Sequence, residues 1–406
     1  MAYKNVEGGV TAPKGFKASA VYAGIKSKKS EKPDMALLLS ETATSCAAVF
    51  TTNKFCAAPV IIGREKLKAA KLRAIIVNSG CANAATGKEG IANADKIQNE
   101  AAKLLGLEPD EVIMSSTGTI GVQLPVEKML EGVKKLVPLL DKKNGHDAAY
   151  AIMTTDTVSK EMSFELELSG GTVTMGAMCK GAGMIHPNMA TMLAYFTTDA
   201  VISADVLQPM LKDAVDKSFN MTTVDGDTST NDSLFLIANG ASGVKVETEA
   251  DKKAFKEALD YICIGMARKI AADGEGASHL MIVEAQNLQT LKDARLVAKA
   301  IAGSNLFKAA LFGQDANWGR IIGAAGYSGA EFDTEHLDCY LESCAGKIQV
   351  MKEGAGLVFD EDKAATILKE KDITVIVDFH DGKECATAYG CDLTYDYVKI
   401  NGDYRS

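Results

Sequence analysis

One stretch, KGAGMIHPNMATML at residues 180–193, constrains the folding of this chain more than any other. Gly181 and Gly183 flank a single alanine, and glycine allows backbone conformations that a residue with a Cβ atom rarely adopts. Pro187 lacks a backbone donor and pushes the preceding residue toward an extended conformation, so no helix can run through this stretch. Thr191 then stands directly before an apolar run. The sequence therefore predicts a glycine-rich loop that leads into a buried strand.

Two interpretations of this stretch are open from the residues alone. The first is structural, because glycine-rich turns before buried strands are routine. The second is chemical: the hydroxyl of Thr191, held at the end of a proline-bent loop, becomes a nucleophile when a base lies beside it. Spacing within the stretch does not decide between them.

Composition excludes several classes of protein. The chain has 406 residues, 47% of them hydrophobic and 24% charged, which allows a sizeable core and predicts two or three domains. Its net charge of −9 argues against a nucleic-acid or anionic-membrane partner, because such partners call for clustered lysine and arginine. No apolar run approaches the ~18 residues of a membrane span, and the N-terminus has no signal-peptide pattern. We expect a cytoplasmic protein.

The cysteines favour a reducing compartment and no metal site. Nine cysteines are scattered along the chain, an odd number without a C-x-x-C pair, and several stand among small or apolar residues, as Cys46 does. We expect most of them to be reduced and buried. A zinc site needs paired ligands at short spacing, and the five histidines form no such pairs.

The first third of the chain alternates short strands with polar loops, as in an α/β fold. Residues 35–39 and 74–77 are brief apolar runs that predict buried strands. Residues 78–87 are small and polar, which predicts a loop where backbone and ligand can approach closely. An amphipathic pattern over 91–105 predicts a helix that ends at Gly106.

A second polar segment follows a strand expected at 111–114. Residues 115–121, SSTGTIG, predict a loop whose backbone N–H groups can point at an anion. An ordinary strand-to-helix turn is the alternative. Pro125 then suits the first position of the next helix.

The middle of the chain leads into and out of the glycine-rich stretch. Residues 163–168 alternate strictly and turn into 172–175, which predicts a hairpin that delivers the chain to Lys180. Residues 203–219 and 254–270 predict helices.

Three later features complete the organisation. Residues 222–232 hold three carboxylates but lack the spacing of an EF-hand, so we expect a site wall or a network of turns. Glu275 stands between two glycines, where packing is a poor explanation. Residues 373–379 predict a strand that turns at 380–382 into a partner strand. No linker separates the two halves, so we expect them to be interleaved.

The stretch at residues 180–193 resembles the self-cleavage site of the ornithine acetyltransferase family, the glutamate N-acetyltransferases of arginine biosynthesis. The residues that carry the resemblance are KGAGM at 180–184, Pro187 and MATML at 189–193. The resemblance runs from GGVTAP at 8–13 to YRS at 404–406 and so covers essentially the whole chain.

In that family the precursor cuts itself before the threonine. The resemblance places the cut between Ala190 and Thr191 and implies two interleaved chains, residues 1–190 and 191–406, of an α/β acyltransferase of the N-terminal-nucleophile type. It also implies a heterotetramer with two chains of each kind. The freed α-amine of Thr191, with a reference pKa near ~8, can then act as the base for its own hydroxyl.

The resemblance further implies roles for individual residues. The Thr117 hydroxyl and the Gly118 N–H correspond to donors for the developing oxyanion, and losing one such donor typically costs about 3–4 kcal/mol. Lys180 suits the carboxylate of an N-acetylated amino acid, and Glu275 suits the amine of ornithine. The substrate-binding residues that it implies are Thr154, Lys180, Thr191, Glu275, Asn401 and Ser406. Judged singly, Lys180 could be a solvated loop charge, and Asn401 and Ser406 parts of a frayed tail.

The activity that the resemblance implies is transfer of an acetyl group from N2-acetylornithine to glutamate, through an acetyl-threonine intermediate. It implies no metal and no organic cofactor, and it leaves open whether acetyl-CoA serves as an additional donor. One alternative is an N-terminal-threonine amidohydrolase or aminopeptidase, in which water replaces glutamate. The other is a non-catalytic binding protein that retains the glycine-rich loop.

Overall fold

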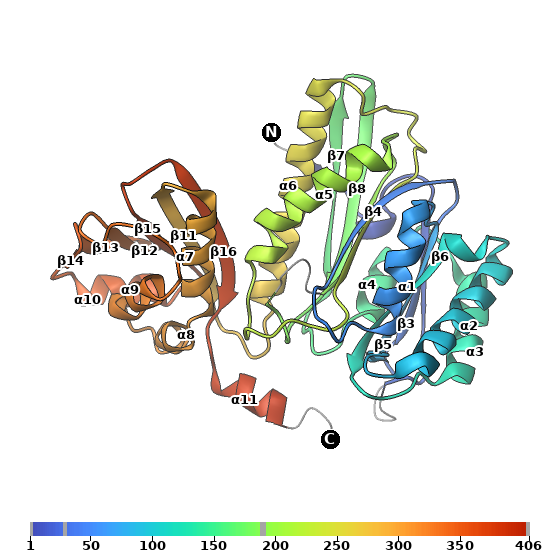
Figure 1. Cartoon of the computed structure of the whole chain (residues 1–406), viewed down its shortest axis with the longest axis horizontal. Helices are drawn as coiled ribbons and strands as arrows, with labels where there is room; N and C mark the ends of the chain where they lie inside the picture. The colour runs from blue at the N-terminus through green and yellow to red at the C-terminus, as the bar shows by residue number, and fades with distance from the viewer. Residues whose placement is uncertain (1–2, 27–30, 187–191, 403–406) are drawn as a thin grey trace. The chain divides into compact units, whose positions relative to one another are not determined.

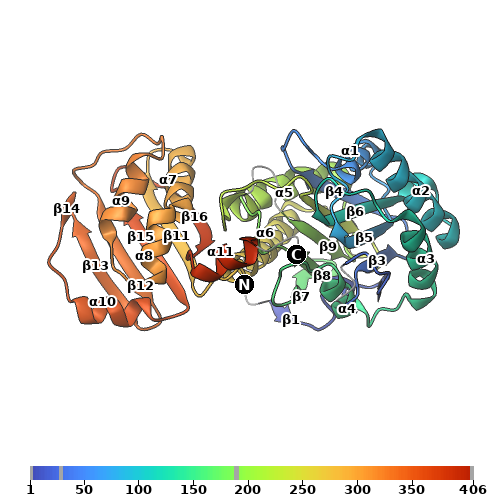
Figure 2. The same cartoon turned by 90° about the horizontal axis from the view of Figure 1, so that it is seen from below.

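The chain alternates between two units of structure, drawn in Figures 1 and 2. The computed structural model describes residues 3–26, 31–186 and 192–402. Unit 1 consists of Met1–Gly181, Asn188–Asp216 and Thr228–Met266, and unit 2 of Ala182–Pro187, Lys217–Asp227 and Ala267–Ser406. Both units contain segments from before and after position 190, which confirms that the two halves of an α/β chain are interleaved.

The first sheet of unit 1 contains the segment that follows the predicted nucleophile. Its strands are, in spatial order, β1 (Lys4–Asn5), β7 (Lys160–Leu168), β8 (Gly171–Lys180), β9 (Leu193–Thr198), β10 (Ser233–Ala238) and β4 (Ser45–Phe50). β8 and β9 pair antiparallel with Lys180 opposite Leu193, and β9 and β10 are parallel. Every residue of β9 and β10 is buried, so both faces of these central strands are covered. The predicted hairpin and the buried strand after it are confirmed.

Two helices pack on this sheet. α5 (Ala204–Lys217) binds the edge strand β4 through Gln208, whose side-chain amide donates to the Ala48 carbonyl at 3.0 Å and accepts from the Ala48 N–H at 3.1 Å. Gln208 thereby satisfies backbone groups that an edge strand leaves unpaired. α6 (Glu249–Ala272) packs closely on β7. Gly265 of α6 approaches Met162 of β7 so closely that a Cβ atom at position 265 would lie 2.8 Å from Met162 Sδ.

The second sheet of unit 1 has the order β2 (Phe16–Val21), β3 (Met35–Ser40), β5 (Ala74–Cys81) and β6 (Val112–Thr119). Its helices are α1 (Ala58–Lys66), α2 (Gly87–Leu105), α3 (Val126–Leu136) and α4 (Gly145–Ala151). α1 and α2 contact β6 (Figure 1), and α3 contacts β2 and β3. Gly106 ends α2 in a left-handed conformation at φ 67°, as predicted.

Unit 2 is built on one sheet. Its order is β14 (Ala355–Gly356), β13 (Gly346–Lys352), β12 (Asp338–Ser343), β15 (Asp372–Asp378), β11 (Leu280–Leu288) and β16 (Glu384–Cys391). The helices of this unit are α7 (Leu291–Gly303), α8 (Asn305–Phe312), α9 (Trp318–Gly326), α10 (Glu361–Leu368) and α11 (Tyr395–Gly402). α7 contacts β11 and β16, and α10 contacts β12 and β13 (Figure 2). Short 3-10 helices elsewhere in the chain span Gly9–Thr11, Leu67–Ala69, Pro109–Glu111, Val137–Leu139 and Phe219–Met221.

Two segments predicted as loops are partly strand. β5 continues to Cys81 and β6 continues to Thr119, so the first residues of both polar segments belong to a parallel pair. The small polar residues fit this pairing because they let the two strands approach closely. The loop prediction was wrong for these residues and holds only for the residues that follow them.

One predicted strand pair is also wrong. The strand β15 forms as expected, but it does not pair with β16 after the turn at residues 380–382. β11 lies between them, parallel to β15 and antiparallel to β16. The turn packs against the end of β11, since a Cβ atom at Gly382 would lie 2.1 Å from the Leu288 carbonyl oxygen.

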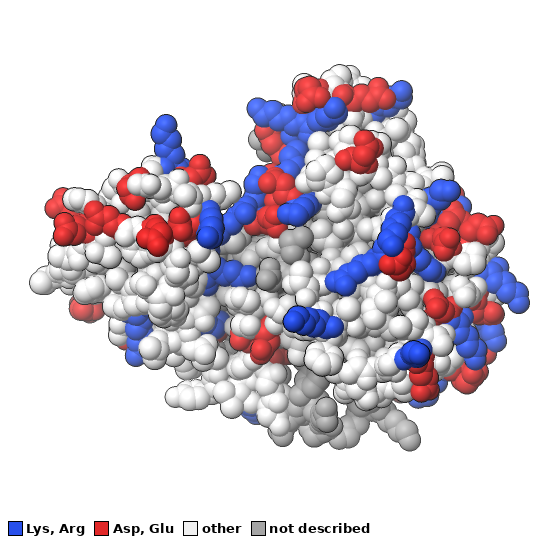
Figure 3. Space-filling view, in the orientation of Figure 1, with Lys and Arg blue, Asp and Glu red and all other residues white. Residues whose placement is uncertain are grey.

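The surface and the cysteines agree with the composition. All nine cysteines lie in described parts of the chain and are free, and six of them are buried. Among the described residues, no helix is long and apolar enough to cross a membrane. On the face drawn in Figure 3, basic and acidic side chains are interspersed.

Candidate active site

Thr117 and Gly118 lie on β6, where its pairing with β5 is irregular. Gly80 lies opposite Gly118, and Cys81 lies opposite both Thr117 and Thr119. Gly118 has a φ of 130°, which favours glycine, and a Cβ atom there would lie 2.3 Å from the Gly80 carbonyl carbon. The close approach of β5 therefore requires glycine at position 118, and it fixes the backbone beside Thr117.

The side chains of Lys180 and Thr117 meet within unit 1. Lys180 ends β8, is only 8% exposed, and donates from Nζ to Thr117 Oγ1 at 3.4 Å. Lys180 is therefore not a solvated loop charge. A buried ammonium beside a fixed hydroxyl is an arrangement that can stabilise an anionic oxygen.

Thr154 is held by Asp156, a residue that the sequence did not single out. Asp156 Oδ2 accepts from the Thr154 N–H at 3.0 Å, and Oδ1 accepts from the Gly181 N–H at 2.6 Å and from Lys160 Nζ at 2.7 Å. Burial alone would raise the pKa of Asp156, but the positive charges of Lys180 and Lys160 and the donors around it lower that pKa to about 2. One carboxylate therefore connects Thr154 to the residue that follows Lys180.

Glu275 and Asn401 meet within unit 2. Asn401, on α11, donates from Nδ2 to Glu275 Oε2 at 2.7 Å, so it lies in a helix and not in a frayed tail. Glu275 is 7% exposed, and its N–H donates to the Ala182 carbonyl at 2.8 Å. A Cβ atom at Gly183 would lie 2.3 Å from Glu275 Oε2. The second glycine of the glycine-rich stretch therefore makes room for this carboxylate.

Two more aspartates bind backbone N–H groups of the same stretch. In unit 2, Asp225 accepts from the N–H groups of Met184 at 2.6 Å and Ile185 at 2.9 Å. In unit 1, Asp232 Oδ1 accepts from the Met192 N–H at 2.9 Å. The polar loop that supplies both aspartates therefore binds the glycine-rich stretch through backbone N–H groups, and the expectation of a site wall or a network of turns stays a prediction.

His186 also has a defined environment in unit 2. Its Nδ1 lies 3.0 Å from Thr223 Oγ1. Burial, with the positive charge of Lys299, lowers the pKa of His186 to about 4. The neutral imidazole is therefore the form present at neutral pH.

The remaining predicted residues, Ala190, Thr191 and Ser406, lie outside the residues that the structure describes. The cleavage site, the nucleophile and the last substrate contact therefore stay predictions. The described site residues fall into two groups, which are Thr117, Gly118, Thr154 and Lys180 in unit 1, and Glu275 and Asn401 in unit 2.

Nothing in the sequence indicated a role for Asp156, and the sequence pointed to Asp232 only as one of three carboxylates in the polar loop at residues 222–232. Asp232 stands directly before an entirely buried strand, and a carboxylate that borders such a run needs an explanation. Its neighbour Asn231 donates from Nδ2 to the carbonyls of Ala82 at 2.6 Å and Ser116 at 2.8 Å. Asp156 stands among threonines and carries no comparable signal.

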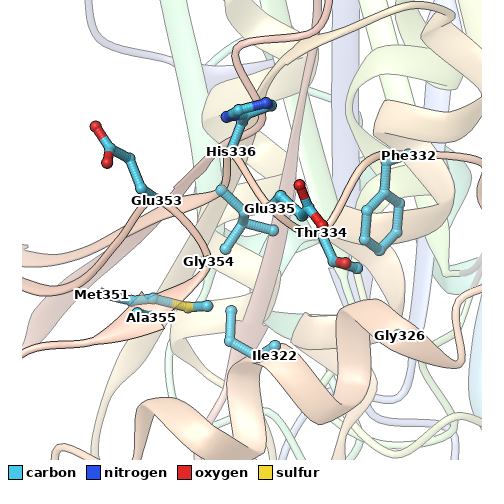
Figure 4. Close-up of a pocket in the computed structure, with 11 residues that line it drawn as sticks. Ile322, Gly326, Phe332, Thr334, Glu335, His336, Met351, Glu353, Gly354 and Ala355 are labelled. Carbon is cyan, nitrogen blue, oxygen red and sulfur yellow. The ribbon is translucent and has the colours of Figure 1, made fainter.

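A separate pocket of about 810 Å³ lies in unit 2 and contains none of the predicted site residues. Figure 4 shows its lining, which comes from α9, from residues 332–337 and from β13 and β14. In the described part of the chain, no group of three or more histidine, cysteine, aspartate or glutamate residues is placed to hold a metal ion.

Comparison with known proteins agrees with the resemblance seen in the sequence. The chain is 49% identical over 401 residues to a protein of Symbiobacterium thermophilum named arginine biosynthesis bifunctional protein ArgJ, a match that covers 98% of this chain and 99% of that protein. A solved structure of the protein of that name from Bacillus halodurans is 43% identical with a TM-score of 0.50, and covers 52% of this chain and 99% of its own. A solved ornithine acetyltransferase of Mycobacterium tuberculosis, in complex with ornithine, is 40% identical with a TM-score of 0.43, and covers 47% of this chain and 100% of its own. The model of the ArgJ family matches residues 17–406, and the chain belongs to that family.

Proposed function

We propose that this chain is the precursor of a self-cleaving acetyltransferase of arginine biosynthesis. It moves an acetyl group from N2-acetylornithine to glutamate through an ester on Thr191. The name of the Symbiobacterium relative supports the pathway, because the match covers nearly all of both chains. The mature chains are residues 1–190 and 191–406.

The observation that carries the proposal is the meeting of Lys180 and Thr117. A buried ammonium and a hydroxyl lie 3.4 Å apart in unit 1, next to a strand pair in which Lys180 is opposite Leu193. Leu193 follows Thr191 by two residues, so Lys180 lies on the strand next to the one that follows the nucleophile. Thr117 meets Lys180 from β6, a strand of the second sheet of unit 1. This arrangement supports acyl transfer at Thr191.

The residue types at the proposed cleavage site allow the precursor to cut itself. Thr191 Oγ bonds to the Ala190 carbonyl carbon, the bond from that carbon to the Thr191 nitrogen breaks, and the hydroxyl proton passes to the nitrogen. Water then opens the ester, which leaves a carboxylate on Ala190 and a free amine on Thr191. That amine becomes the base for the same hydroxyl in the transfer reaction.

In the transfer reaction, the acetyl group passes first to Thr191 with departure of ornithine, and then to the amine of glutamate. The Thr117 hydroxyl and the Gly118 N–H donate to the oxyanion of each step. Lys180 binds the substrate carboxylate, and Glu275 with Asn401 binds the side-chain ammonium of ornithine. Thr154 and Ser406 complete the substrate contacts.

The length of a solved relative supports cleavage. The Bacillus halodurans chain is matched over 99% of its length but covers only 52% of this chain, as expected for one product of a cut near the middle. We infer a heterotetramer of two chains of each kind in the cytoplasm, without a metal or organic cofactor. Acetyl-CoA is a candidate second donor, because the relative is named bifunctional.

The test combines maturation with activity. Wild-type protein should give two fragments on a denaturing gel, one with Thr191 at its N-terminus by mass spectrometry, while Thr191→Ala should give one inactive chain. Glutamate acetylation is then measured with acetylornithine and with acetyl-CoA as donors. Release of free acetate without acetylglutamate would favour the amidohydrolase. An uncut wild-type chain would favour the binding protein.

A further inference from the structure

Met192, the residue directly after the proposed nucleophile, has a strained backbone. Its φ is 137°. Residues with a side chain rarely adopt this positive value, which favours glycine. Met192 is also 4% exposed, so its side chain is packed in the core of unit 1. Strained conformations of this kind persist only where the surroundings determine them, and they gather at functional sites.

Two consecutive residues determine this conformation. Asp232 Oδ1 accepts from the Met192 N–H at 2.9 Å, and the Ser233 N–H donates to the Met192 carbonyl at 2.9 Å. Both backbone polar groups of Met192 are therefore bound by the start of β10. Ser233 is already held by the parallel β9–β10 ladder, where it lies opposite Leu193. Asp232 is thus the contact that a side-chain substitution can remove.

A buried carboxyl group such as that of Asp232 is unusual as a partner for a backbone N–H. Asp232 is 1% exposed, and its burial raises the pKa of the carboxyl well above the ordinary range, although Ser229, the Met192 N–H and the charge of Lys180 oppose the rise. A buried carboxyl is costly, so a protein keeps one where the group has a task. Here the hydrogen bond to Met192 is the task that the contacts indicate.

We propose that Asp232 is a positioning residue for self-cleavage, which holds Met192 at positive φ and so fixes the backbone on the carboxyl side of Thr191. The inference rests on the proposed function and extends it. The Met192 nitrogen is bonded to the Thr191 carbonyl carbon, so a hydrogen bond on that nitrogen sets where the chain leaves the nucleophile. Rates of intramolecular attack fall steeply when the reacting groups are misplaced by an ångström.

The test compares two double variants that share the same loss of packing. Met192→Ala and Met192→Gly both remove the methionine side chain, but only glycine adopts positive φ without strain. Each is combined with Asp232→Ala. The first-order rate of fragment appearance is measured on denaturing gels after synthesis of the precursor in a cell-free system, with circular dichroism to confirm that each purified variant is folded.

We expect the single variant Asp232→Ala to cleave at least tenfold more slowly than wild type. Of the two double variants, the one with Met192→Gly should cleave at least tenfold faster than the one with Met192→Ala. Asp232→Asn should cleave within about threefold of wild type, because an amide oxygen can still accept from the Met192 N–H. Equal rates for the two double variants would overturn the inference, as would an Asp232→Asn variant as slow as Asp232→Ala. If wild-type protein gives no fragment that begins at Thr191, the proposed function falls as well, so the two failures are distinguishable.

Discussion

At the scale of single residues, the Thr117 hydroxyl is held in place by neighbouring residues of the protein. Gly118 fixes the strand beside it through the close approach of Gly80, and Lys180 donates to its oxygen. A donor that is already oriented needs no reorganisation when negative charge develops, and this is the condition for a large catalytic effect. Thr117 should therefore act on the transition state more than on substrate binding.

Replacing Thr117 with alanine tests that role. In fully processed enzyme, Thr117→Ala should lower kcat by ~10²-fold or more and change KM little, because the donor matters mainly when the oxyanion forms. Thr117→Ser retains the hydroxyl and should keep most of the activity. Glu275→Gln should instead raise KM for acetylornithine, since a carboxylate–ammonium contact binds the ground state. Steady-state kinetics of glutamate acetylation measure all three, and an increase in KM alone for Thr117→Ala would contradict the assignment.

His186 gives a prediction for the dependence of stability on pH. Its folded-state pKa of about 4 lies below the ordinary value of 6.5, so the unfolded chain takes up a proton first as the pH falls. The stability that it contributes is present above pH 6.5 and is lost as the pH falls toward 4. His186→Gln, which has no such proton to bind, should lose less stability between pH 7 and pH 5 than wild type. Urea unfolding midpoints at the two pH values measure this, and equal losses would contradict it.

Some of these residues could be identified from the sequence and others could not. Thr117, Lys180 and Glu275 were found because they belong to contiguous motifs that can be read by resemblance. Asp156 and Asp232 could not be assigned a role in this way, because each acts through contacts with residues distant in the chain, such as Gly181 and Met192. A contact between distant residues leaves no local pattern.

At the scale of elements, a buried ion pair at the start of β7 also holds the end of β8, because its carboxylate accepts from a backbone N–H there. Lys160 begins β7, Asp156 precedes it, and the same carboxylate binds the N–H of Gly181 after β8. The side chains of Lys160 and Asp156 are 1% and 0% exposed. Removing one partner from a fully buried pair leaves an uncompensated charge, whereas removing both is often tolerated.

A double-mutant cycle separates the structural part of this pair from the functional part. Asp156→Asn should destabilise the protein by about 3–5 kcal/mol, because the buried Lys160 loses its carboxylate. Adding Lys160→Met should restore much of that stability, as measured by urea unfolding. Activity should not return, because the Thr154 and Gly181 N–H groups bind different carboxylate oxygens, and the asparagine side chain replaces one of these oxygens with an NH2 group that cannot accept. Recovery of activity in parallel with stability would show that Asp156 only supports the fold.

The elements that were predicted incorrectly share one physical cause. Residues 78–81 and 115–119 have the composition of loops, yet they pair with each other as parallel strands. The partner of β16 was also misplaced, since a tight turn at residues 380–382 does not reveal that β11 inserts beside it. Helices such as α2 and α6 were predicted well, because their amphipathic periodicity is local. Strand pairing between distant segments depends on the tertiary fold and has no such local signature.

At the scale of the whole molecule, the interleaving of the two halves determines whether they stay together after cleavage. β8 and β4 precede the proposed cut, and β9 and β10 follow it. The sheet pairs β8 with β9, and β10 with β4, so two buried ladders join the halves. Every residue of β9 and β10 is buried, and separating the halves would expose these strands to water.

We therefore expect the chains 1–190 and 191–406 to remain together after cleavage. In buffer without denaturant they should elute from a size-exclusion column as one species that contains both fragments in equal amounts, and they should separate only when urea unfolds the sheet. The Thr191→Ala precursor provides the matched uncut control and should elute at the same volume, because a cut next to β9 removes no strand pairing. A denaturing gel of the eluted fractions measures the result. Separate elution of the two fragments without denaturant would contradict the shared sheet, since strands buried on both faces cannot be released without unfolding.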